Sequence, residues 1–181
     1  MSFPQSTAQP PELSFRMLRQ FADPEFARDL RRRTRLGPLD AQLFPGEGLG
    51  DRFARALCEA HALPFKELLE GFEFFHRCRK LLRGPELADV CCGHGLVGVL
   101  FALFERDVER VLLLDRKRPA SYDRVVAAAD SVAPWTRPKL TYVETDLKRA
   151  KSHVNPGCSV VAVHACGLRT DRSLDLALHT G

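Results

Sequence analysis

The sequence has no run of about 18 apolar residues, the length that a membrane-spanning helix requires. Its first residues, MSFPQSTAQPPE, also lack the basic and apolar segments of a secretory signal peptide. No internal repeat is apparent. We therefore expect no membrane partner and a cytoplasmic location.

Regular cysteine spacing is absent too, because the six cysteines form no Cys-x-x-Cys pair. In a chain without an export signal they are expected to be reduced thiols rather than a disulfide framework. Several thiols and imidazoles would meet if the fourth predicted strand lies beside the first: Cys91, Cys92, His94, His164 and Cys166. Because the spacing typical of metal ligands is missing, no metal site is expected.

The sequence has no large excess of charge of either sign. Its 27 Lys and Arg residues and 23 Asp and Glu residues give a formal net charge of +4. That balance permits a nucleic-acid partner without requiring one. The densest basic run is Arg31-Arg32-Arg33-Thr34-Arg35. Its guanidinium groups either span phosphates or form a solvated helix face next to nearby acidic residues.

Residues 1–11 are rich in Pro, Ser and Gln and have the composition of a disordered tail. Residues 12–84 form a helical region, because apolar side chains recur there at three- and four-residue spacing. The clearest helix is predicted after Pro64, with Glu67 in its first turn.

From residue 85 to residue 181 short apolar runs alternate with helix-length segments. This alternation is typical of βαβ units, whose parallel strands are buried on both faces. Four strands are predicted near 87–91, 110–114, 139–143 and 159–164. The fold class is therefore α/β, with an incomplete Rossmann-like parallel sheet that follows a small helical region.

The segment from Asp89 to Leu96, DVCCGHGL, closes the first predicted strand and opens the first helix. Gly93 and Gly95 allow a tight turn and a close approach to a ligand. With Gly98 they also satisfy the dinucleotide pattern Gly-x-Gly-x-x-Gly, so two cofactors compete for this loop. Asp89 favours the one with a cationic amino group, because a carboxylate repels a pyrophosphate.

Two further aspartates follow the next strands. Asp115 ends the second strand, where a carboxylate can accept hydrogen bonds from both hydroxyls of a ribose. Asp146 follows the third strand, where it either meets an adenine amino group or caps the next helix.

Together, Asp89 with Gly93-x-Gly95, Asp115 and Asp146 resemble the successive motifs of class I S-adenosylmethionine-dependent methyltransferases. The resemblance covers residues 85–181 and implies S-adenosyl-L-methionine as the cofactor. In that family three alternating glycines follow the acidic residue, and Cys91 occupies the first of those positions here.

The segment from His164 to Asp171, HACGLRTD, is similar to the His-x-Cys-Gly-x-x-Thr-Asp segment of one methyltransferase branch. That branch includes transfer RNA ribose 2′-O-methyltransferases. The resemblance implies a hydroxyl acceptor, with an RNA ribose first, since the Asp/Asn-Pro-Pro-aromatic motif of amino methylation is absent. It implies that His164 faces this acceptor.

The role of His164 has two interpretations. An imidazole at this position can accept the proton of a hydroxyl group, or it can bind backbone and only shape the pocket. Two other functions also stay open: a catalytically inactive methyltransferase-like scaffold, which Cys91 favours, and an NAD-dependent oxidoreductase.

A complete sheet of this family has seven strands, and we expect residues 85–181 to be the first part of such a domain. The apolar fourth strand, SVVAVHA, would then have an uncovered edge. We therefore expect poor solubility, an oligomer or a partner that covers this edge.

Overall fold

The computed structural model of the protein describes residues 16–21, 35–82 and 84–181. Within them, four strands form one all-parallel sheet with the order β3-β2-β1-β4. The strands are β1 Glu86–Val90, β2 Arg110–Asp115, β3 Leu140–Glu144 and β4 Ser159–Ala162. This arrangement confirms the predicted α/β class with a Rossmann-like parallel sheet and a helical region before it.

The strand boundaries lie within one residue of those predicted, except at the end of β4. That strand was expected to reach residue 164 and ends at Ala162. His164 has a φ of 62°, outside the extended region, so the chain leaves the sheet before it.

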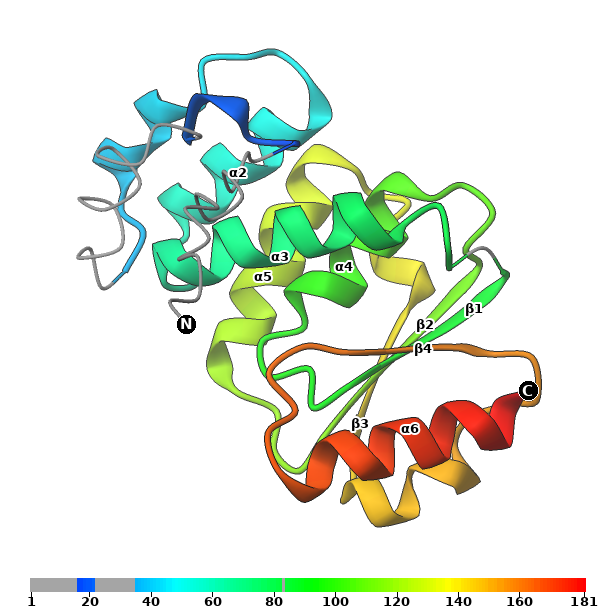
Figure 1. Ribbon diagram of the computed structural model, residues 1–181. Coiled ribbons are helices and arrows are strands. Elements are labelled where there is room, and N and C mark those ends of the chain that lie inside the picture. Colours follow the sequence, from blue (N-terminus) through cyan, green and yellow to red (C-terminus); the bar gives the residue numbers. More distant parts are fainter. Residues whose placement is uncertain (1–15, 22–34, 83) are drawn as a thin grey trace, which may run out of the picture.

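The described helices are α2 Leu49–Glu59, α3 Phe65–Cys78, α4 Leu96–Phe104, α5 Ala120–Val132 and α6 Leu168–Thr180. Short 3₁₀ segments are η1 Arg19–Phe21, η2 Pro38–Leu43, η3 Arg137–Lys139 and η4 Leu147–Ser152. Figure 1 shows α3, α4 and α5 on one side of the sheet and α6 on the other.

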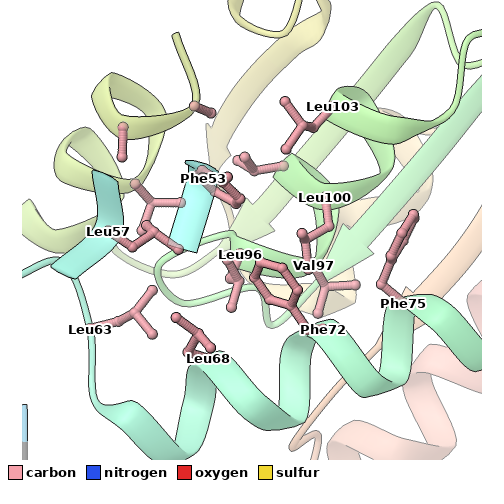
Figure 2. Packing of buried hydrophobic residues seen from close by; sticks show 14 of the residues in the cluster. Phe53, Leu57, Leu63, Leu68, Phe72, Phe75, Leu96, Val97, Leu100 and Leu103 are labelled. Atoms are coloured by element: carbon pink, nitrogen blue, oxygen red, sulfur yellow. The ribbon is translucent and has the colours of Figure 1, made fainter. Parts of the chain in front are cut away.

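The larger core joins the sheet to the helical region. Leu87, Val111 and Leu113 point from the strands into one cluster with α4 and α5. The same cluster continues to Phe72 and Phe75 of α3, which pack against the apolar face of α4 in Figure 2. Since α4 is buried along eight successive residues, α3 and the sheet hold it from both sides.

The opposite face of the sheet has a smaller core. Ala88, Val90 and Leu114 point toward α6 and η4, where they meet Leu176 and Ala150. Because side chains alternate along a strand, the neighbours of these residues point toward α4. Asp89 is one of those neighbours and lies near the carboxyl end of β1.

β4 is an edge strand of the described sheet, and α6, which packs against it, exposes leucines. On α6, Leu174 and Leu178 have 60% and 83% of their surface exposed. The predicted uncovered edge of the fourth strand is therefore present in the described part of the chain.

Two of the predictions fall on residues outside the described ranges. They are the tail of residues 1–11 and, in the basic run, residues 31–34, while Arg35 is exposed. Among the described residues, no helix has both the length and the apolar character that crossing a membrane requires.

Candidate functional site

The glycine loop turns sharply between β1 and α4, as predicted. Gly93 and Gly95 have φ values of 53° and 72°, in the left-handed region that favours glycine. At Gly95 a Cβ would also lie 3.2 Å from side-chain carbons of Leu113 and Tyr122. Both constraints explain why glycine stands there.

Cys91 also has a positive φ, 55°, although it carries a Cβ. Cys91 therefore has the left-handed backbone conformation that favours glycine, as Gly93 and Gly95 do. A side chain there costs conformational energy, and it occupies space at the carboxyl edge of the sheet.

Asp89 is buried, with 2% of its surface exposed. Its Oδ2 accepts a hydrogen bond from the Gly98 amide at 2.9 Å, in the first turns of α4. Burial raises the pKa of this carboxyl to about 7, against the opposing effect of the Gly98 hydrogen bond. The side chain does not point into solvent, and a cationic ligand group beside it would favour the ionised form.

Asp115 holds the loop from the end of β2. Its Oδ2 accepts a hydrogen bond from the Gly93 amide at 2.8 Å, and its Oδ1 accepts one from the Arg116 amide at 2.7 Å. From β3, Tyr142 donates its hydroxyl to the Gly93 carbonyl at 3.1 Å. Side chains from both β2 and β3 therefore hold Gly93 in place.

Asp146 acts as a helix cap, which was one of its two predicted roles. It is the N-cap of η4, where its Oδ1 accepts a hydrogen bond from the Lys148 amide at 3.0 Å. This bond and the Arg116 guanidinium, whose Nη2 lies 2.9 Å from Oδ2, lower the pKa of Asp146. The adenine-binding role stays a prediction.

His164 follows β4 and lies near α3 of the helical region. Its Nε2 is 3.2 Å from Oε2 of Glu70, and 60% of its side chain is exposed. The positive φ turns the chain at this point, so the imidazole lies at the rim of the site rather than within the sheet.

Several of the predicted site residues line one cavity of about 450 Å³. Asp89, Cys91, Gly93 and His164 all line it, whereas Gly95, at the start of α4, lines neither this cavity nor the next. A second cavity of about 20 Å³ is lined by Cys91, Asp115 and Asp146, among others. Cys91 and Arg169 border both cavities, so the two are adjacent.

The sequence did not predict a role in cofactor binding or catalysis for several residues at this site: Glu67, Glu70, His94, Tyr142 and Arg169. The two glutamates lie one turn apart on α3 and face the cavity together. Their spacing was visible in the sequence, but nothing there relates a helix before the sheet to the glycine loop. Only the packing of α3 on α4 brings them together.

The cysteines near the site are free. Burial raises the pKa of the Cys91 and Cys92 thiols, so both stay protonated and weakly nucleophilic at neutral pH. In the described ranges, no group of three or more His, Cys, Asp or Glu residues has a geometry that can hold a metal ion.

Comparisons with models of protein families, with curated proteins and with solved structures each gave no match. The geometry described above is therefore the basis for a functional proposal.

Proposed function

We propose that this protein binds S-adenosylmethionine at the carboxyl edge of its sheet and transfers the methyl group to a hydroxyl acceptor. The observation that carries the proposal is the buried carboxylate of Asp89, which lines the larger cavity beneath Gly93. The Gly98 amide already binds Oδ2, and a cationic donor such as the ammonium group of an amino acid would stabilise the buried carboxylate further.

The same carboxylate disfavours a dinucleotide. Gly98 fits either ligand, because a Cβ there would lie 2.6 Å from Leu113 Cδ2, and the close helix-strand approach is common to both kinds of site. A pyrophosphate over this loop would be repelled by ionised Asp89. The loop geometry alone therefore does not distinguish a dinucleotide from S-adenosylmethionine, and the charge of Asp89 favours the latter.

The nucleoside would lie on the side of Asp115 and Asp146. Each carboxylate oxygen has two lone pairs, so the amides bound to Asp115 leave acceptor capacity for ribose hydroxyls. The smaller cavity, about 20 Å³, fits a water molecule and not an adenine. Adenine binding requires the Arg116 side chain to move, and this costs little because that side chain is 62% exposed.

The acceptor side would be the wall formed by His164 and α3. When bound, S-adenosylmethionine supplies a methyl group activated by the positive sulfur. The protein then has to align the acceptor oxygen with that methyl group and exclude competing water. On the resemblance of the segment at His164, a ribose hydroxyl of RNA is the first acceptor to test.

Calorimetric titration with S-adenosylmethionine tests the proposal. At a pH of about 7.5 Asp89 is largely ionised, while an α-amino group, with a pKa of about 7.7–8.0, is still mostly protonated. We expect Asp89→Asn to weaken binding by about 10- to 100-fold, the effect of losing a charged hydrogen bond. Asp175→Asn, an exposed change on α6, is the matched control and should bind as the native protein does.

The same titration separates the other two functions. Absence of binding to the folded native protein would favour an inactive scaffold. Preference for NAD over S-adenosylmethionine would favour an oxidoreductase. Equal affinity of the native protein and Asp89→Asn would remove the observation on which the proposal depends.

A further inference from the structure

A second histidine of the site, His94, is held by a carboxylate from the helical region. It lies between Gly93 and Gly95, and its Nε2 is hydrogen-bonded to Oε2 of Glu67 on α3. This hydrogen bond is the largest cause of the lowered pKa of Glu67. Glu67 is therefore ionised at neutral pH and can only accept, so Nε2 of His94 is the donor.

The other ring nitrogen of His94 has no partner. A neutral imidazole that carries its proton on Nε2 has a lone pair on Nδ1. Nδ1 of His94 is buried and makes no hydrogen bond within the described part of the chain. A buried acceptor without a donor costs free energy, and residues at functional sites are where such costs are found.

His94 borders the larger cavity, so a small shift of its ring brings the buried Nδ1 within reach of a ligand that donates a hydrogen bond. The residue lines the larger cavity together with Asp89 and Cys91. Its side chain is 19% exposed, against 60% for His164 in the same cavity. Less water therefore competes for its free nitrogen than for the imidazole at the rim.

The arrangement of carboxylate, imidazole and free nitrogen is that of an oriented base. In such a pair the carboxylate fixes the tautomer and stabilises the imidazolium that forms when the second nitrogen takes a proton. Glu70 and His164 form a more exposed carboxylate–imidazole pair, because their 3.2 Å contact lies at the rim of the cavity.

We propose that His94, oriented by Glu67, is the base that accepts the proton of the acceptor hydroxyl; this inference rests on the proposed methyl transfer. The oxygen forms its bond to the methyl carbon as the bond from that carbon to sulfur breaks, and the sulfur keeps the electron pair. The hydroxyl proton passes to Nδ1 of His94 and then leaves to solvent. His164 contacts the acceptor at the rim and positions it.

The first test needs no acceptor. Long-range proton–nitrogen correlation NMR on the protein labelled with ¹⁵N-histidine, recorded at a pH where the imidazoles are neutral, reports which nitrogen of each ring carries the proton. We expect a single tautomer for His94, with the proton on Nε2, and a mixture of tautomers in Glu67→Ala. A proton on Nδ1 of native His94 would overturn the proposal. Glu73→Ala, also on α3 but paired with Arg77, is the control and should leave the His94 signals unchanged.

The second test measures transfer of labelled methyl groups from S-adenosylmethionine to unmodified transfer RNA transcripts. We expect His94→Gln to bind S-adenosylmethionine normally and to lose about 10²- to 10⁴-fold in kcat, the usual contribution of a general base. His164→Gln should mainly raise KM, and added imidazole should restore part of the activity of His94→Ala. The exposed His153→Gln is the control.

The outcomes separate this inference from the proposed function. If the native protein fails to bind S-adenosylmethionine, the proposed function fails, whatever the NMR result. If it methylates the transcripts and His94→Gln does so at the native rate, only the role of His94 is overturned. If it binds S-adenosylmethionine and leaves the transcripts unmodified, transfer RNA is the wrong acceptor and the tautomer of His94 decides the inference.

Discussion

Asp89 is the residue on which both the cofactor proposal and a stability prediction depend. Its pKa is raised from 3.8 to about 7 by burial. Between these two pH values the folded protein keeps a proton that the unfolded chain has released. The free energy of unfolding therefore falls as pH rises from about 4 to about 7, and above that this group adds no further change.

Asp89→Asn should remove this pH dependence, because an amide of the same shape can still accept the Gly98 hydrogen bond and does not ionise. Relative to that variant, we expect the native protein to lose up to about 4 kcal/mol of stability across this pH window. Urea unfolding of both proteins at several pH values measures the difference. Parallel stability curves would show that Asp89 ionises as easily in the folded protein as in the unfolded one.

Cys91 carries a side chain in a backbone conformation that suits glycine. With its φ of 55°, Cys91→Gly should relieve strain of about 1–2 kcal/mol while adding conformational freedom to the unfolded chain. We expect a net gain of about 0.5–1 kcal/mol, measured by thermal unfolding.

The same variant should tighten binding of S-adenosylmethionine in calorimetry, because the Cys91 side chain lines both cavities. Cys166→Gly removes an exposed thiol outside both of these cavities and serves as the comparison. Weaker binding by Cys91→Gly would mean that the thiol contacts the ligand.

The close packing of α4 against β1 and β2 sets the position of the glycine loop between β1 and α4. A Cβ at Gly98 would lie 3.0 Å from Val111 Cγ1 and 3.3 Å from Asp89 Cβ, besides its contact with Leu113. Gly98→Ala should therefore push α4 away from β1 and β2. We expect a loss of about 1–3 kcal/mol in urea unfolding, the cost of overpacking a core.

Gly50→Ala on α2 is the matched control, because a Cβ there would meet only ordinary contacts from 3.4 Å outward. Alanine favours a helix over glycine, so this variant should be as stable as the native protein or more stable by up to about 1 kcal/mol. Equal effects of the two substitutions would show that the approach of α4 to the strands is looser than described.

In the described part of the chain, the sheet has an open edge at β4, and the neighbouring α6 exposes leucines. β4 has no strand on its outer side in the described residues, and Leu174 and Leu178 are exposed on α6 next to it. Such an edge and apolar surface favour association. We expect the protein to self-associate as its concentration rises, as sedimentation velocity can measure.

Replacing both Leu174 and Leu178 with lysine should shift the protein toward the monomer. Leu39→Lys tests whether any exposed leucine has this effect, since Leu39 is 83% exposed but lies in η2, in the helical region. A native protein that stays monomeric at every concentration would contradict the prediction.

The local patterns of the sequence predicted the sheet and the loop. Buried parallel strands need short apolar runs, and a strand-to-helix turn with positive φ favours glycine. Both features can therefore be recognised from residues that are adjacent in the sequence. For this reason the strands near Glu86, Arg110, Leu140 and Ser159 and the turn at Gly93 and Gly95 were all predicted.

The patterns were less informative where one residue can serve two roles. Asp146 had two interpretations from sequence, and the structure confirms the cap, because the hydrogen bond to the Lys148 amide depends only on local geometry. Whether it also meets adenine depends on where the Arg116 side chain lies, which no local pattern describes.

The sequence therefore established the fold class of this protein and the aspartates and glycines at the strand ends, since these follow from neighbours along the chain. The wall that α3 contributes to the larger cavity came from packing. Glu67 and Glu70 precede the sheet, and they reach His94 and His164 only because the apolar face of α3 is buried against α4. A contact between residues that far apart in the chain depends on how two helices pack together, and the residue spacing within either helix does not determine that packing.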